Sequence, residues 1–218
     1  MSLDPERRFP LMCLTQDGTG VPHSEQAERL CVAGARWIQL RMKDAADDVR
    51  LAEATRCAEA CRRHGAILVV NDRVDVALEC GADGVHLGSL DCGWQEARRA
   101  LGPGRILGGT VNNASDARRA RESGCLDYAG VGPLRHTATK RNLAPVLGPA
   151  GVAALIEALA PLPAWVIGGV GAGDAPGLLQ AGAAGIAVSS PLHAGGTLEA
   201  NCRALLDALG VGTTPLAP

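Results

Sequence analysis

Cations, an amide and apolar side chains alternate in the segment WIQLRMKD, residues 37–44. Gln39, Arg41 and Lys43 take every second position, and a period of two is typical of a β-strand with one apolar face and one polar face. Positive charges that point into a protein are costly unless an anion meets them. The segment therefore predicts an anionic ligand beside this strand or, as the alternative, a buried network of ion pairs with nearby carboxylates.

Lysine is rare in this chain. Of 21 basic residues only Lys43 and Lys140 are lysines, and both lie at or just beyond the expected end of a strand. A lysine ammonium is a compact point charge that suits phosphate oxygens or a Schiff base, whereas arginine suits fixed bidentate contacts. Both lysines are therefore candidates for a ligand contact, with two solvated surface lysines as the simpler alternative.

Two aspartates, Asp72 and Asp91, follow the apolar runs AILVVN and GVHL. Carboxylates at neighbouring strand ends repel each other unless a cation joins them. Mg²⁺ binds one or two carboxylates together with phosphate oxygens, so a diphosphate that bridges Mg²⁺ and the cationic face would satisfy both sets of charges.

The elements that must position these side chains alternate along the chain. Strands are predicted near residues 11–17, 37–42, 66–72, 84–88, 105–111, 128–134, 164–169 and 185–190. Helices, two of them with Ser24 and Asp174 as capping residues, are predicted at 24–35, 45–64, 94–100, 114–123, 149–159, 175–180 and 198–209. Eight βα units predict an α/β protein, a (β/α)8 TIM barrel in a single domain over residues 1–218, with loose ends at 1–9 and 210–218. An open doubly wound sheet is the alternative.

In such a barrel the carboxyl ends of the strands surround the active site. Glycines and serines follow the last two strands, in VIGGVGAGD and VSSPL. This is where barrels often hold a phosphate on backbone N–H groups, so a second anion site is expected there. A purely structural turn at Gly168 and Gly169 is the alternative.

The composition argues against a nucleic-acid-binding protein, a membrane protein and an exported protein. A formal net charge of −2 gives no basic field for nucleic acid, and the apolar runs are too short to cross a bilayer. The N-terminal segment lacks the apolar core of a signal peptide. The eight cysteines are expected to be reduced core residues, which favours the cytoplasm. A homo-oligomer is compatible with the sequence.

Several motifs together resemble the thiamine phosphate synthase family. They are QLRMK, VNDRVDVAL, ADGVHLGSLD, GGTVNN, GVGPLRHTATK, VIGGV and AVSS, and they span about Leu11 to Leu209. The resemblance implies a (β/α)8 barrel that joins hydroxymethylpyrimidine diphosphate to thiazole phosphate and releases thiamine phosphate and diphosphate.

The resemblance also implies roles for individual residues. The pyrimidine diphosphate would be bound by Gln39, Arg41, Lys43, Asn71, Thr110 and Lys140. Mg²⁺ would be held by Asp72 and Asp91. The thiazole phosphate would be bound by Thr137, Thr139, Gly169, Val188, Ser189 and Ser190. Catalysis would consist of stabilising the departing diphosphate, a role for Arg41, Lys43 and Lys140.

The chain departs from the family pattern at a few positions. Ser89 stands where glutamine is common, Thr110 stands where serine is common, and Arg135 with His136 replaces an aromatic-proline pair. The last change alters the expected lid, residues 134–148, or brings another cation to the phosphate.

Three rival functions remain. A related thiazole tautomerase would need a histidine where this chain has Asn112. A Schiff-base aldolase on the same barrel would use Lys43 or Lys140. A non-catalytic sensor of phosphate ligands would keep the pocket and lack turnover.

Overall fold

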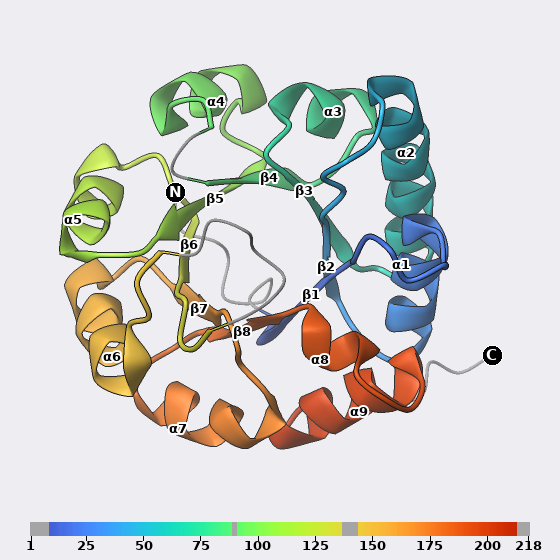
Figure 1. Ribbon diagram of the computed structural model, residues 1–218. Coiled ribbons are helices and arrows are strands. Elements are labelled where there is room, and N and C mark those ends of the chain that lie inside the picture. The colour runs from blue at the N-terminus through green and yellow to red at the C-terminus, as the bar shows by residue number, and fades with distance from the viewer. Residues whose placement is uncertain (1–8, 89–90, 137–143, 213–218) are drawn as a thin grey trace.

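The computed structural model describes residues 9–88, 91–136 and 144–212. Parallel strands close into a barrel in which each strand is hydrogen-bonded to its neighbours in sequence and β8 pairs with β1 (Figure 1). The strands are β1 Leu11–Leu14, β2 Trp37–Leu40, β3 Ile67–Asn71, β4 Gly84–Leu87, β5 Ile106–Val111, β6 Tyr128–Val131, β7 Ala164–Ile167 and β8 Gly185–Val188. The predicted (β/α)8 barrel is confirmed, and closure between β8 and β1 excludes the open sheet.

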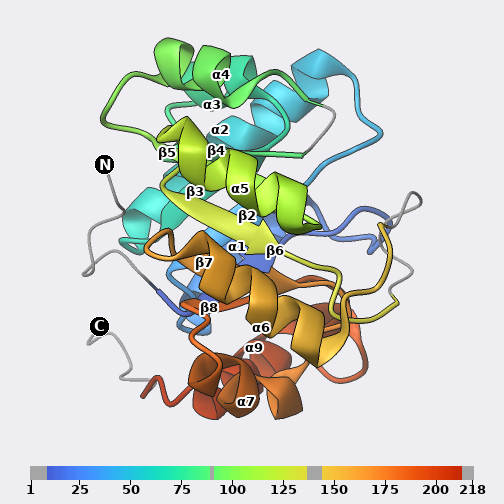
Figure 2. The same cartoon turned by 90° about the vertical axis from the view of Figure 1, so that its left-hand side faces the viewer.

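Helices form an outer ring, and Figure 2 shows α5 and α6 along the outside of the barrel near β6. The helices are α1 His23–Val32, α2 Asp47–Arg63, α3 Val74–Glu79, α4 Trp94–Leu101, α5 Ala114–Ser123, α6 Gly148–Leu159, η2 Ala172–Asp174, α7 Ala175–Gln180, α8 Ser190–His193 and α9 Leu198–Ala208. Within the described ranges, no helix combines the length and apolar character that a membrane span requires.

Two apolar layers stabilise the barrel: an outer layer between the strands and the surrounding helices, and an inner layer. The inner layer lies inside the strands and consists of Met12, Leu14, Trp37, Ile67, Val69, Ile106, Tyr128, Trp165 and Ala187. Its aromatic rings meet edge to face, with the Trp37 centroid 4.8 Å from that of Trp165 and 5.2 Å from that of Tyr128. These three rings come from the first or second residue of their strands, so they fill the amino half of the barrel. The carboxyl half of the barrel is therefore free of these aromatic rings and has room for polar side chains.

Every predicted strand is confirmed, each with fewer residues than predicted. The predicted cap at Ser24 is wrong: Pro22 precedes α1, and Ser24 lies inside the helix, where its backbone N–H donates to Glu53 Oε2 over 2.8 Å. Asp174 does precede α7, although its side chain accepts hydrogen bonds from elsewhere. Helices α3, η2 and α8 were not predicted, because elements of three to six residues show little of a helical period, although α7, which also has six residues, was predicted.

The predicted loose ends, 1–9 and 210–218, lie mostly outside the described residues. All eight cysteines are described and are unpaired thiols. Six are buried, as expected of core residues, whereas Cys125 is partly exposed and Cys92 is exposed.

Candidate active site

Within β2, the strand that begins WIQLRMKD, the side chains have the predicted orientation. Ile38 and Leu40 belong to the outer apolar layer between strands and helices, whereas the Gln39 amide lies inside the barrel and donates to Met12 Sδ over 3.4 Å. Gln39 is almost completely buried. Arg41 and Lys43 follow the last residue of β2 and therefore lie at the carboxyl end of the barrel.

Lys43 reaches across to the end of β3. Its Nζ donates to Asp72 Oδ2 over 3.1 Å, and the two side chains are 44% and 30% exposed. Asp72 has a φ of 67°, a left-handed conformation that is uncommon outside glycine and tends to occur at functional sites. The backbone at the end of β3 thus turns sharply at the residue that carries the carboxylate.

Asp91 joins this pair from the loop after β4. Its Oδ2 accepts the Gly88 N–H over 2.6 Å. Burial and then contact with the Asp72 carboxyl hold the pKa of Asp91 above its ordinary value, while the Gly88 N–H and Lys43 act in the opposite direction. The predicted convergence of the two aspartates is therefore found, and their repulsion is only partly relieved by Lys43.

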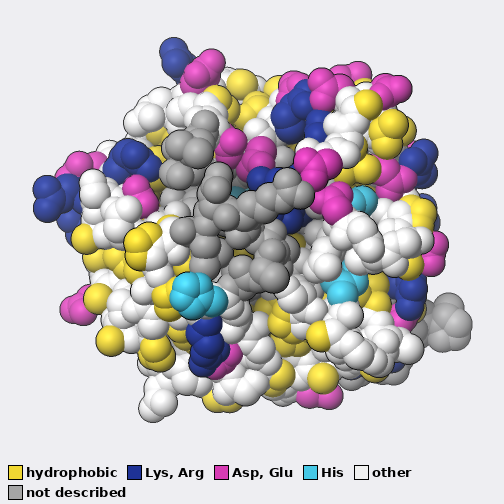
Figure 3. Space-filling view, viewed as in Figure 1, with side chains coloured by type: hydrophobic (Ala, Val, Ile, Leu, Met, Phe, Trp, Pro, Cys, Tyr) yellow, Lys and Arg dark blue, Asp and Glu magenta, His cyan; other side chains and the backbone are white. Residues whose placement is uncertain are grey.

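The aspartate pair supplies too few ligands to surround a metal by itself. Among the described residues, no group of three or more histidine, cysteine, aspartate or glutamate side chains is arranged to hold an ion. Two repelling carboxylates fit Mg²⁺, which takes oxygen ligands and commonly completes its shell with water and substrate phosphates. Figure 3 shows acidic and basic side chains next to one another near the centre of this face.

A chain of polar side chains crosses the barrel from β4 to β5 and β6. His86 Nε2 lies 3.0 Å from Thr110 Oγ1, and His86 Nδ1 lies 3.0 Å from the Tyr128 hydroxyl. Gly130 makes room for the imidazole, because a Cβ there would lie 2.9 Å from His86 Cε1. Asn71, at the end of β3, is in register with His86. Asn71 and Thr110 thus lie on β3 and β5, the two strands that flank β4 and its His86.

His86 is not among the site residues predicted from the sequence. The signal was present, because Val85 and Leu87 in GVHLG are apolar residues of the outer layer and alternation turns the intervening histidine inwards. Tyr128 was likewise missed. It is buried within the barrel, which raises its pKa.

The loops after β6 and β7 are joined by Arg135. Its backbone N–H donates to Gly168 O over 2.9 Å, and its guanidinium donates to Gly169 O over 3.0 Å. The same guanidinium forms two hydrogen bonds with Asp174, of 2.8 and 2.7 Å, and holds the pKa of that carboxyl below its ordinary value. The charge of Arg135 is therefore paired with Asp174, and its contacts join the two loops.

Gly168 and Gly169 have positive φ values of 89° and 69°. A side chain at Gly168 would also collide with Pro133, whose Cβ would be 2.6 Å away. Both the conformation and the close approach require glycine, so the structural explanation of these glycines holds whether or not a ligand binds there.

The end of β8 carries the other predicted phosphate contacts. β8 ends at Val188, Ser189 is buried, and its hydroxyl donates to Gln16 Oε1 over 3.1 Å. Ser190 is exposed and begins the short helix α8.

Four residues named in the sequence analysis lie outside the described residues, namely Ser89, Thr137, Thr139 and Lys140. The expected lid, residues 134–148, is described only at 134–136 and 144–148. Asn112, which stands in the tautomerase histidine's place, uses its amide to donate to Gly132 O, and its backbone N–H donates to Asp116 Oδ2 over 3.1 Å.

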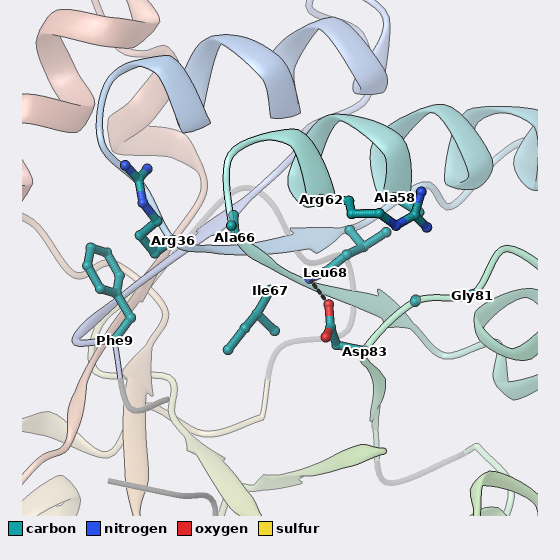
Figure 4. A pocket seen from close by; sticks show the side chains of 11 residues that line it. Phe9, Arg36, Ala58, Arg62, Ala66, Ile67, Leu68, Gly81 and Asp83 are labelled. Carbon is teal, nitrogen blue, oxygen red and sulfur yellow. Dashed lines mark hydrogen bonds between the residues drawn. The ribbon is translucent and has the colours of Figure 1, made fainter. Parts of the chain in front are cut away.

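A cavity of about 500 Å³ lies at the opposite, amino end of the barrel. Figure 4 shows Phe9, Arg36, Arg62, Ile67 and Asp83 around it, with Asp83 accepting the Leu68 N–H over 2.9 Å. None of the predicted site residues lines this cavity, so it is separate from the polar cluster at the carboxyl end.

Comparisons with known proteins agree with this geometry. Residues 11–192 match the family model described as thiamine monophosphate synthase. The thiamine biosynthesis bifunctional protein ThiM/ThiE of Symbiobacterium thermophilum is 46% identical over 189 residues, which cover 87% of this chain and 39% of that protein. The thiamine-phosphate synthase of Phocaeicola vulgatus is 41% identical over 191 residues, which cover 86% of this chain and 91% of that protein.

Thiamine phosphate pyrophosphorylase from Pyrococcus furiosus has a similar structure, with a TM-score of 0.85 at 28% identity over 95% of this chain and 98% of that chain. The matched region thus covers less than half of the bifunctional relative and nearly all of the two other proteins. On the extent of the family match and the identity to a relative of similar length, this chain belongs to the thiamine monophosphate synthase family.

Proposed function

We propose that this protein joins hydroxymethylpyrimidine diphosphate to thiazole phosphate, with Mg²⁺, and releases thiamine phosphate and diphosphate. Family membership supports the reaction. The observation that carries the proposal at the level of the site is the meeting of Lys43, Asp72 and Asp91 at the carboxyl ends of neighbouring strands. Two carboxylates and a cation suit a complex of Mg²⁺ with diphosphate better than they suit Mg²⁺ alone or diphosphate alone.

The diphosphate half of the site would be built from β2 to β4. Asp72 and Asp91 would hold Mg²⁺, which supplies positive charge next to the leaving group when it is bound. Gln39, Arg41, Lys43 and Lys140 would contact the pyrimidine diphosphate. Positive groups that are fixed before the reaction favour a transition state in which negative charge grows on the departing diphosphate, so Arg41, Lys43 and Lys140 would act catalytically.

The pyrimidine would lie near Asn71 and Thr110. The contact of Thr110 with His86 supports this role, because it fixes the direction of the hydroxyl before a ring arrives. Loss of diphosphate would leave a carbocation on the pyrimidine methylene carbon, and the thiazole nitrogen would supply the electron pair for the new C–N bond. Water must be excluded while this carbocation exists.

The thiazole phosphate would be bound on the far side, by Thr137, Thr139, the backbone at Gly169 and Val188, and the hydroxyls of Ser189 and Ser190. The Arg135 contacts support this assignment, since they fix the Gly168–Gly169 turn from the neighbouring loop. The hydrogen bond from Ser189 to Gln16 similarly holds that serine in place.

The rival functions are less well supported. An amide cannot act as the base of a tautomerase, and the Asn112 amide already bridges to the loop after β6. The contact of Lys43 with Asp72 suits an electrostatic role rather than a Schiff base. No observation at the site favours a sensor over an enzyme.

A coupled assay tests the proposal. The protein is incubated with both substrates and Mg²⁺, and thiamine phosphate is measured by its oxidation to fluorescent thiochrome phosphate. Omission of either substrate is the control. Tight binding of thiamine phosphate without its formation would indicate a sensor, and reductive trapping of a carbonyl compound by borohydride would indicate an aldolase.

We further propose that residues 1–218 act as one domain in the cytoplasm, alone or as a homo-oligomer, with small molecules as ligands and neither nucleic acid nor a membrane as a partner. Eight unpaired thiols support a reducing compartment.

A further inference from the structure

The end of β2 is held by side chains of the loop that follows β1. The ladder between the two strands finishes with the Thr15 N–H, which donates to Gln39 O over 3.0 Å. Beyond this point the Arg41 N–H donates to Thr15 Oγ1 over 3.1 Å, and the Lys43 N–H donates to Asp17 Oδ2 over 3.2 Å. Side-chain oxygens thus replace the carbonyl groups that a longer strand would have provided.

His23, the first residue of α1, joins these two side chains. Its Nδ1 lies 2.7 Å from Thr15 Oγ1 and its Nε2 lies 3.1 Å from Asp17 Oδ1. The residue is only 6% exposed. Thr15, Asp17 and His23 are called the His23 network below.

The chemistry of the acceptors sets the direction of these hydrogen bonds. A carboxylate only accepts hydrogen bonds, so His23 Nε2 carries a hydrogen and donates a hydrogen bond to Asp17 Oδ1. In the neutral imidazole, Nδ1 then accepts from the Thr15 hydroxyl. The Thr15 oxygen remains able to accept the Arg41 N–H. This arrangement of protons therefore satisfies every hydrogen bond of the network.

We propose that Thr15, Asp17 and His23 are positioning residues that fix Arg41 and Lys43 for an anionic ligand. The inference rests on the proposed function for the identity of that ligand, a diphosphate. None of the three residues belongs to the site assigned above. Their hydrogen bonds go to the backbone of the two cationic residues, so they act through those residues and not on the ligand itself.

The opposite side of the same segment is also fixed. Arg50, in α2, donates to Met42 O over 3.3 Å and to Lys43 O over 3.2 Å. Segment 41–43 is thus held through its N–H groups by the His23 network and through its carbonyl groups by Arg50. Such a support limits the angular freedom of two long side chains, which lowers the entropy that ligand binding must remove.

The loop after β1 divides its contacts between the two halves of the site. Thr15 and Asp17 contact the segment after β2, whereas Gln16 between them accepts the hydroxyl of Ser189 beyond β8. Loss of the His23 network should therefore affect the diphosphate half of the site and spare the half assigned to thiazole phosphate.

The test uses matched variants of His23. In His23→Asn the amide occupies the level of Nδ1 and can still contact Thr15, whereas in His23→Gln it occupies the level of Nε2 and can still contact Asp17. His23→Ala removes both contacts. Ser24→Ala, at the next position of α1, is the control because its hydroxyl makes only a 3.4 Å contact with Glu53. Circular dichroism checks that each variant is folded.

The first measurement is hydrogen exchange of the Arg41 and Lys43 amides by NMR. We expect His23→Ala to accelerate exchange at both amides by roughly tenfold or more, since a protected amide exchanges through local opening. His23→Asn should restore protection chiefly at Arg41, and His23→Gln chiefly at Lys43. Ser24→Ala should leave both amides protected. A role confined to the stability of α1 would accelerate exchange along that helix without this division.

The second measurement is calorimetric titration with diphosphate in the presence of Mg²⁺, and separately with thiazole phosphate. We expect His23→Ala to weaken diphosphate binding about tenfold and to leave thiazole phosphate binding unchanged. Unchanged exchange at Arg41 and Lys43, or unchanged diphosphate affinity despite faster exchange, would overturn the proposal. Failure of the original protein to bind diphosphate would instead refute the proposed function, while exchange at the two amides would still decide whether the network holds them.

Discussion

Asp91→Asn tests the metal site, because it removes one carboxylate charge and almost no volume. The asparagine oxygen can still accept the Gly88 N–H, and its amide can donate to the Asp72 carboxyl that Asp91 now repels. In the absence of metal we expect Asp91→Asn to be at least as stable as the unsubstituted protein. The gain should not exceed about 1 kcal/mol, because Asp91 is only partly desolvated and remains exposed, so solvent screens its repulsion with Asp72.

With Mg²⁺ and diphosphate the order of stability should reverse. A ligand that binds only the folded protein adds about 2.7 kcal/mol at 100 times its Kd, and 1 kcal/mol shifts the Tm of a protein of this size by about 2 to 4 °C. We therefore expect a rise in Tm of roughly 5 to 11 °C for the original protein and little change for Asp91→Asn. Thermal unfolding followed by circular dichroism measures both.

The same variant gives a test by pH. Burial and Asp72 hold the pKa of Asp91 above its ordinary value, so at this one group the folded metal-free protein binds more protons than the unfolded chain does. The contribution of this group to stability is fully present below the ordinary aspartate pKa of about 3.9 and is lost as the pH rises through the raised pKa. The stability of Asp91→Asn should lack this pH-dependent contribution. A variant that is less stable without metal, or that gains as much Tm from Mg²⁺ as the original, would refute the reasoning.

Three further substitutions separate charge, geometry and packing. Leu40→Ala should lower the free energy of unfolding by roughly 2 to 5 kcal/mol, measured by denaturant titration, because Leu40 is 1% exposed in the outer layer; its diphosphate affinity should be unchanged. Arg41→Lys should weaken binding of the pyrimidine diphosphate by about tenfold, measured by calorimetry, because an ammonium cannot form two parallel hydrogen bonds; equal weakening for thiazole phosphate would contradict the assignment. Lys140→Ala should lower kcat by roughly a hundredfold, measured in the coupled assay, whereas a change in KM alone would indicate uniform binding.

The sequence predicted those features that depend on neighbours in the chain. Alternation along β2 gave the orientation of Gln39 and Leu40, because side chains on a strand must point to opposite faces. The convergence of Asp72 and Asp91 followed from the rule that parallel strands in a closed barrel end on the same side. Both inferences need only the strand positions.

Contacts that depend on the path of a loop could not be predicted in the same way. Arg135 and Asp174 are 39 positions apart and meet because the loops after β6 and β7 share one rim. His23 lies beside Asp17 and Thr15 because α1 begins over the end of its own strand, a placement that depends on the turn at residues 17–22. The six-residue helix α3 was missed because fewer than two turns show little of a helical period.

The balance of charge at the mouth of the barrel favours coupled binding of metal and diphosphate. Arg41 and Lys43 contribute two positive charges, and Asp72 and Asp91 contribute two negative charges, so these four groups sum to zero. A diphosphate that approaches them alone meets both cations and carboxylates, whereas Mg²⁺ would shift the same set to +2. Each ligand should therefore raise the affinity of the other, and by thermodynamic linkage the two factors must be equal. Calorimetric titration of Mg²⁺ with and without diphosphate, and of diphosphate with and without Mg²⁺, measures both factors on the protein after correction for the complex that the two form in solution. Independent binding would mean that the carboxylates do not hold the metal that faces the diphosphate.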